Sequence, residues 1–188
     1  MNILIDKLPQ EYEGLKINTN FRSFILFELL MQDNKLNEKE KVAISLNLFY
    51  EDLQPKDYKK ALDGIIWFYT SGKNTKEKKQ VQTVEKKNKK LIYSFEHDAD
   101  LIYSAFLSQY SIDLNEIEYL HWWKFKSLFE GLNDENKICQ YMSYRAMDIS
   151  KIKDKDQKKY YKDLQRKVAL PDNRSEDEKE QDFADALW

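Results

Sequence analysis

The side chains that could do chemistry in this chain are few and far apart. It has two histidines, His97 and His121, and one cysteine, Cys139, so no zinc-binding spacing of Cys and His exists. His97 precedes Asp98 and Asp100, and such a grouping could hold a metal ion or supply a general base. A histidine beside acidic residues at a helix start is the commoner explanation, and we favour it here.

Phosphate chemistry has equally little support. The four glycines of the chain form no glycine-rich phosphate-binding loop. Residues 73–90 contain eight lysines against two glutamates, with no arginine and no aromatic residue. Such a run offers neither base stacking nor bidentate base readout, only weak, salt-sensitive attachment to phosphates. We therefore interpret it as a solvated linker, and we expect no catalytic residue, no cofactor and no metal ion.

The elements that must position these residues are predicted to be helices. Charged residues make up 34% of the chain and aromatic residues 14%, whereas glycine and proline are scarce. This composition favours a mainly α fold, and we expect a bundle of about six to seven helices. A small N-terminal β-hairpin or a short two- to three-stranded sheet is expected beside it. Residues 3–5 would pair with 15–17, and alternating Leu91, Tyr93 and Phe95 would add a third strand.

Capping residues predict where the helices begin. Gly72 has the character of a helix stop after the third of them. The expected starts are Thr19 or Asn20, Asn37 with Glu40, Pro55, Asp98, Asp113 with Glu116, Asp134 with Glu135, and Asp154 with Gln157.

Composition divides the chain into four parts. We expect an N-terminal helical half over 1–72, the lysine-rich linker over 73–90, a C-terminal helical half over 91–171 and an acidic tail with a short terminal helix over 172–188. No stretch approaches transmembrane length, and the start lacks the apolar run of a signal peptide. The net charge of −2 favours neither a membrane nor nucleic acid as partner. A soluble cytoplasmic protein is expected.

The centre of the predicted fold is a pair of helices within residues 98–132. The second, expected over 116–132, is apolar on two sides, so it must be covered on both or leave one side to a partner. Trp122 and Trp123 cannot share a face, because neighbours on a helix point about 100° apart. We expect core packing for most of these aromatic residues, His121 included, with one ring left as an anchor for a partner. The candidates on this helix are Trp122, Trp123, Phe125 and Phe129.

The acidic tail is the other candidate for partner binding. It has seven acidic residues against two basic ones, and it ends with Phe183, Leu187 and Trp188 on one side of the expected short helix. We expect this edge to dock into an apolar groove, either on this chain or on a neighbouring copy, which would be self-association. A solvated terminus is the alternative.

Several runs of residues are distinctive when taken together. They lie at 95–106, at 120–125 with 128–129, at 142–148, at 151–159 and at 169–171, and an acidic tail that ends in Ala-Leu-Trp follows. Shorter matches occur at 8–9, 19–22 and 53–55. The most specific is Leu-His-Trp-Trp-Lys-Phe at 120–125. Across nearly the whole chain these runs resemble a family of small tail-module proteins of long-tailed phages and prophages of Gram-positive bacteria. Ser143 departs from the glycine that the family favours there.

The resemblance implies a gene between those for the tail tube and the tape measure protein, and a role as a tail-assembly chaperone. The family has no known catalytic residues. It implies a non-enzymatic protein of the host cytoplasm that binds the tape measure protein and, as a second partner, the tail tube protein. Tyr144 and Arg145 of the matched run join the partner-binding candidates. A structural tail completion or connector protein of the virion, and a weak nucleic-acid-binding accessory protein using residues 73–90, are the alternatives.

Overall fold

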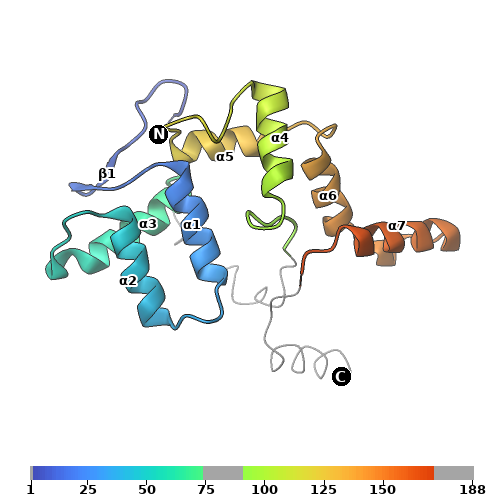
Figure 1. Cartoon of the computed structure of the whole chain (residues 1–188), viewed down its shortest axis with the longest axis horizontal. Helices are drawn as coiled ribbons and strands as arrows, with labels where there is room; N and C mark the ends of the chain where they lie inside the picture. The colour runs from blue at the N-terminus through green and yellow to red at the C-terminus, as the bar shows by residue number, and fades with distance from the viewer. Residues whose placement is uncertain (1, 74–90, 172–188) are drawn as a thin grey trace.

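The computed structural model describes residues 2–73 and 91–171 (Figure 1). Within them the chain forms seven α-helices and one two-stranded antiparallel sheet, so the predicted mainly α fold with a small N-terminal hairpin is confirmed. The elements are β1 Glu11–Tyr12, β2 Leu15–Lys16, α1 Phe21–Gln32, α2 Glu38–Phe49, α3 Tyr58–Tyr69, α4 Ala99–Tyr110, α5 Trp122–Glu130, α6 Lys137–Ala146 and α7 Lys155–Lys167. Short 3₁₀ turns at Pro55–Asp57 and Ile149–Lys151 precede α3 and α7. Of the described helices, none combines the length and hydropathy that a bilayer crossing requires.

Helix α5 connects the two ends of an elongated molecule (Figure 1). It contacts α1 and α3, which together with α2 form one end, and it contacts α4 on its other side. Helix α4 packs against α6, and α6 packs against α7, which projects at the opposite end. The short α5 therefore has the central place that the sequence predicts for the second helix within residues 98–132, with partners on both sides.

The first strand of the hairpin lies closer to the turn than predicted. Glu11 pairs with Lys16 and Tyr12 with Leu15, around a two-residue turn in which both residues have positive φ. The first strand expected at residues 3–5 is wrong, because these residues lie in an exposed turn. The third strand expected at 91–95 is also wrong, since this segment forms irregular structure and a turn and pairs with neither strand. The tight turn thus sets the register of this small sheet.

Three of the predicted helix caps are confirmed by their hydrogen bonds. The side chain of Asn20 accepts from the backbone N–H of Arg22 at the start of α1. Asn37 and Glu40 form a reciprocal capping box at α2, and Asp154 accepts from the N–H of the third residue of α7. Each cap satisfies backbone donors that a helix start leaves without an internal partner. Helix α6 begins slightly later than expected, with its N-cap one residue after the predicted acidic pair.

The second central helix is much shorter than predicted. Instead of starting at 116, α5 starts at Trp122, and the side chain of Asp113 closes a turn by accepting from the N–H groups two and three residues further on. Arg22 of α1 explains the difference. Its guanidinium donates to four backbone carbonyls of residues 114–118 at 2.7–3.4 Å. Those carbonyls bond to a side chain in place of the backbone donors that a helix would supply.

One contiguous aromatic core joins the two ends of the molecule. Phe125 of α5 stacks on Phe21 of α1 and on Phe106 of α4, with ring centroids 5.0 Å apart in both pairs. Trp122 stacks on Phe24 of α1 at 5.1 Å. Residues before and after the predicted linker therefore share this core. Such stacked pairs add to the free energy gained from burial alone.

Gly72 lies in the turn that ends α3, one position later than predicted, because Thr70 is the C-cap and Ser71 follows it. Replacement of Gly72 with alanine is expected to lower the free energy of unfolding by about 1–3 kcal/mol. Its φ is +71°, and its N–H donates to the carbonyl of Trp67. A Cβ here would lie 3.2 Å from Trp123 and 3.3 Å from Trp67. Alanine therefore meets both backbone strain and crowding, and urea denaturation measures the sum.

Gly14→Ala is the matched control for Gly72→Ala. Gly14 has a similar φ of +80°, but a Cβ there would meet no atom within 4 Å. We expect Gly14→Ala to lower the free energy of unfolding only through the strain of the positive φ, by about 1 kcal/mol. Equal losses in the two variants would show that the two tryptophan rings do not crowd the position.

Candidate functional site

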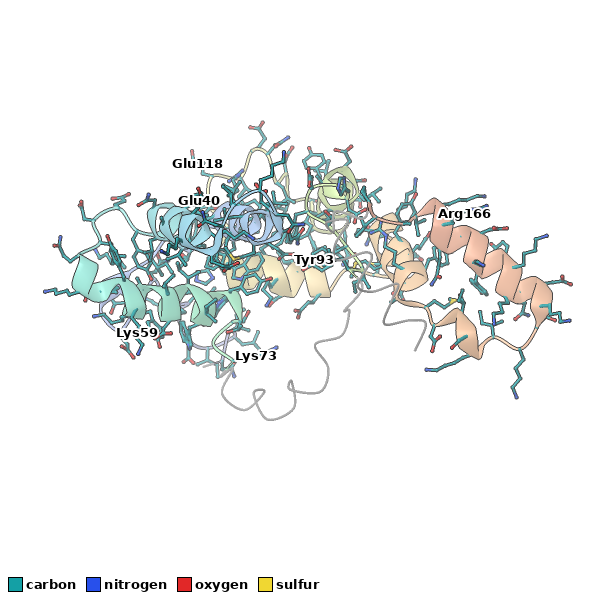
Figure 2. All side chains as sticks on the ribbon, turned by 90° about the horizontal axis from the view of Figure 1, so that it is seen from below. Glu40, Lys59, Lys73, Tyr93, Glu118 and Arg166 are labelled. Atoms are coloured by element: carbon teal, nitrogen blue, oxygen red, sulfur yellow. The ribbon has the colours of Figure 1, made fainter. Side chains whose placement is uncertain are left out.

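An open pocket of about 500 Å³ lies between α5 and α6. One wall is aromatic and is formed by Tyr69, Tyr93, Trp122, Phe125 and Phe129. The facing wall belongs to α6, where Cys139 and Met142 supply sulfur and Ser143 and Ala146 supply small side chains. Figure 2 places Tyr93 midway along the molecule, between the α1–α3 end and the end formed by α6 and α7. The site therefore depends on how the two ends come together.

Three of the predicted partner-binding residues meet in this pocket. All three belong to its aromatic wall, where Trp122 and Phe125 are almost completely buried and Phe129 is half-buried. Trp123 points away from it and packs against Trp67 and Phe68, donating its indole N–H to the carbonyl of Phe68 at 2.7 Å. The two neighbouring tryptophans thus lie on different faces of α5, as the helix geometry requires.

A polar group lies along one edge of the pocket. Tyr69 donates its hydroxyl to Glu28 at 3.0 Å, and Tyr93 hydrogen-bonds to the same carboxyl group. Burial raises the pKa of Glu28 above its ordinary value, while the two phenols oppose that rise. Burial also raises the pKa of Tyr69 and of Tyr93, so both remain protonated donors at neutral pH. This arrangement orients the pocket wall and keeps its polar atoms paired.

Lys126 completes that polar edge. Its ammonium group donates to the carbonyl of Tyr69 at 3.2 Å and lies over the rings of Tyr69 and Trp122, 5.9 and 5.8 Å from their centroids. Burial lowers the pKa of Lys126, and the neighbouring Lys73 lowers it further, whereas Glu130 and Glu28 raise it. The cation is therefore held against the aromatic wall by internal contacts.

Glu28, Lys126 and Met142 are not among the predicted site residues. Glu28 carried a detectable signal, since it directly follows Phe27 on the apolar side of α1 and is a charged residue where burial is expected. The helical pattern also pointed Tyr69 inward. Lys126 and Met142 offered no comparable signal, because their roles depend on elements that are distant in sequence.

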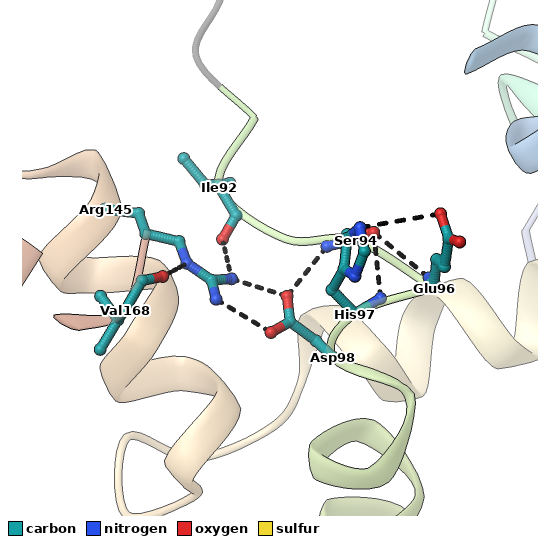
Figure 3. Close-up of polar contacts among 7 residues, drawn as sticks. All are labelled: Ile92, Ser94, Glu96, His97, Asp98, Arg145 and Val168. Atoms are coloured by element: carbon teal, nitrogen blue, oxygen red, sulfur yellow. Dashed lines mark hydrogen bonds and ion pairs between the residues drawn. The ribbon is translucent and has the colours of Figure 1, made fainter. Parts of the chain in front are cut away.

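Arg145, a predicted partner-binding residue, is instead engaged inside the molecule (Figure 3). Its guanidinium donates to both carboxylate oxygens of Asp98, at 2.6 and 2.9 Å, and to the carbonyls of Ile92 and Val168. The side chains of Arg145 and Asp98 are only 4% and 3% exposed. Asp98 also accepts from the N–H of Ser94, so it makes no side-chain cap for α4. This buried pair fastens α6 to the segments before α4 and after α7.

The residues considered for chemistry in the sequence are kept apart by the fold. His97 is exposed and its nearest charged partner is Glu96, 3.7 Å away, while Asp98 points to Arg145 (Figure 3). Burial raises the pKa of the Cys139 thiol, which is the opposite of nucleophile activation. Across residues 2–73 and 91–171, no three His, Cys, Asp or Glu side chains come together as metal ligands would.

His121 has a structural role at the start of α5. Its Nδ1 accepts from the backbone N–H of Trp123 at 3.1 Å, and its Nε2 lies 3.0 Å from the carbonyl of Pro9. Because an N–H can only donate and a carbonyl can only accept, the neutral ring with its hydrogen on Nε2 fits both contacts. Burial lowers the pKa of His121 below 6.5.

The free energy of unfolding is therefore expected to decrease as the pH falls below about 6.5. The unfolded chain binds this proton more readily than the folded chain, so acid shifts the equilibrium toward unfolding until the folded pKa is passed. Denaturation midpoints measured from about pH 7 to 5 test this. His121→Asn keeps an acceptor for the N–H of Trp123 without titrating, so its curve should be flatter. Identical slopes would contradict the assignment.

The remaining predicted site residues lie at the far end of the chain. Tyr144 is half-buried, and its carbonyl accepts from the side chain of Gln165 at 2.8 Å. Phe183, Leu187 and Trp188 lie outside the described residues, as does almost all of the lysine-rich run, so docking of the tail remains a prediction.

The family match extends over nearly all of the residues that the structure describes. The family model described as Bacteriophage Gp15 protein matches residues 4–170, which contain the seven described helices and every described residue lining the pocket. Comparisons with curated proteins and with solved structures gave no match. Because the matched range covers most of the 188 residues, the chain belongs to the bacteriophage Gp15 protein family.

Proposed function

We propose that this protein is a tail-assembly chaperone that holds a helical segment of the phage tape measure protein in the pocket between α5 and α6. The observation that carries the proposal is the pocket itself, which brings together Trp122, Phe125 and Phe129 and stays open on one side. Membership of a bacteriophage family is consistent with this role. So is the resemblance to tail-module proteins of phages from Gram-positive hosts.

The pocket has the properties that reversible capture of a helix requires. Its volume of about 500 Å³ lies within the usual range for binding sites and suits one or two large apolar side chains. Aromatic residues such as Phe129 concentrate interface energy, and Met142 can adapt its shape to different occupants. An amphipathic helix would lay its apolar face into this groove, a common form of peptide recognition. A chaperone of this kind needs contacts that form and release, and no bond chemistry.

Co-expression tests the proposal. The tape measure protein from the same phage or prophage should be more soluble when this protein is present. Ala146→Trp adds a large ring at the exposed edge of the pocket without removing a contact, and it should abolish the gain. Gln140→Trp places the same ring on α6 at an exposed position outside the pocket lining, and it should keep the gain. Unchanged solubility with the wild-type protein would refute the client assignment.

The number of copies of this chain in purified phage particles distinguishes a chaperone from a structural protein of the virion. We expect the chain to be absent from purified particles or present far below one copy per ring of the tail. Stoichiometric copies would favour a tail completion or connector protein instead. The nucleic-acid alternative predicts gel-shift binding that survives near-physiological salt and disappears when Lys86, Lys87, Lys89 and Lys90 are neutralised.

A further inference from the structure

The pocket lining has more acidic than basic side chains. Among the described residues, the carboxyl groups that line it are those of Glu28, Glu130 and Asp134, and the one cation is Lys126. The rest of the lining is uncharged. These four groups differ in whether they have partners within the protein.

Two of the four are already engaged. Glu28 accepts from Tyr69 at 3.0 Å and lies mostly within the protein. Lys126 donates to the backbone of Tyr69 and lies against two rings. Neither group is therefore free to pair with a partner without losing an internal contact.

The other two carboxylates have no hydrogen-bond or salt-bridge partner in the part of the chain that the structure describes, although Glu130 lies close enough to Lys126 to raise its pKa. Glu130 ends α5 and Asp134 lies in the loop before α6, and both are exposed. Neither forms a hydrogen bond or an ion pair with any residue of 2–73 or 91–171. The nearby Arg145 does not reach them, because its guanidinium is held by Asp98. The rim of the pocket thus presents two carboxylates that accept no hydrogen bond and form no salt bridge with a described residue.

We infer that the segment held in this pocket carries a large apolar side chain flanked by lysine or arginine. The inference deepens the proposed function and rests on it. The apolar side chain enters against Phe129 and Met142, and the flanking cation reaches Glu130 or Asp134 one helical turn away. Charges at a rim contribute mainly to selection among partners and to the rate of encounter, so segments flanked by glutamate or aspartate are rejected.

Two synthetic helical peptides test the rule with the full-length protein. They share the same apolar positions, and one has lysine and the other glutamate at the positions three and four residues away. Binding is followed through the methyl signal of Met142, which lines the pocket. We expect the lysine peptide to bind up to about fivefold more tightly at low salt, because an exposed ion pair contributes at most about 1 kcal/mol. The difference should shrink as salt is added.

Charge reversal on the protein supplies the matched test. The double variant Glu130→Lys with Asp134→Lys should reverse the preference between the two peptides. Glu118→Lys with Glu135→Lys changes the net charge equally at exposed positions outside the pocket lining, and it should leave the preference unchanged. A reversal by both double variants would mean that overall charge, and not the rim, selects the partner, and would overturn the inference.

The outcomes also distinguish this rule from the proposed function. Equal affinity for the two peptides in the wild-type protein would leave the pocket as a helix-binding site and overturn the charge rule. If neither peptide shifts the Met142 signal, the pocket is not the capture site, and the inference falls with it. Loss of client solubilisation in Ala146→Trp, together with equal peptide affinities, would support the function and reject the rule.

Discussion

Asp98→Ala is expected to lower the free energy of unfolding by about 3–5 kcal/mol, among the largest effects for a single polar residue of this protein. The carboxylate is 3% exposed and accepts two hydrogen bonds from Arg145 and one from Ser94. Its removal leaves a buried guanidinium without a counter-charge, and the desolvation of that cation is no longer compensated. Urea denaturation followed by circular dichroism measures the loss.

Asp163→Ala is the matched control for this variant. Asp163 pairs with Arg166 at 3.2 Å, but the two side chains are 46% and 80% exposed. Such a pair contributes only about 0–1 kcal/mol. The double variant Asp98→Ala with Arg145→Met should recover part of the stability, because no buried charge then remains unpaired. A loss below about 1 kcal/mol for Asp98→Ala would show that water enters this site and solvates the arginine.

Phe125→Ala is expected to cost about 3–5 kcal/mol, the usual range for removing a buried phenylalanine. The ring is 1% exposed and stacks on Phe21, Phe106 and Trp122. Its loss removes the contact through which α1 and α4 are joined across α5. We therefore expect a lower denaturation midpoint and also a less cooperative transition, measured by fluorescence and circular dichroism together.

Tyr160→Ala provides the comparison on the projecting helix. Tyr160 is 61% exposed, and among the described residues the one aromatic ring that its own ring contacts is that of Tyr161. We expect a change within about 0.5 kcal/mol, as for most surface substitutions. If Phe125→Ala cost no more than Tyr160→Ala, the aromatic stack would not be the joint between the two ends of the molecule.

Capping chemistry could be predicted from the sequence because it is local. Asn20, the Asn37–Glu40 pair and Asp154 satisfy the donors of their own helix starts, so spacing of two or three residues is all that matters. The same holds for Gly72, whose positive φ follows from its place after α3. Composition and helical periodicity likewise determined the mainly α class and the central place of the aromatic residues after His121.

The length of α5 was decided by tertiary structure. The residues before Trp122 carry a helical pattern and a capping-box spacing, yet they are extended or turned. Arg22, almost 100 residues earlier in the chain, donates hydrogen bonds to their carbonyls. Asn20 forms an isolated antiparallel β-bridge with His121. A long-range partner that bonds to these carbonyls overrides local propensity, and no window of sequence around the loop contains that partner.

The candidate site also has one part that the sequence predicts and another that only the tertiary structure determines. Periodicity placed Trp122, Phe125 and Phe129 on one side of a helix, and that side does line the pocket. The pocket itself needs Glu28 from α1 and Met142 from α6 at its two edges, and these residues are 114 positions apart. Arg145 shows the converse, because a residue that looked available to a partner is occupied by Asp98. Which polar side chains remain free depends on pairings between distant segments, and only the folded chain brings those segments together.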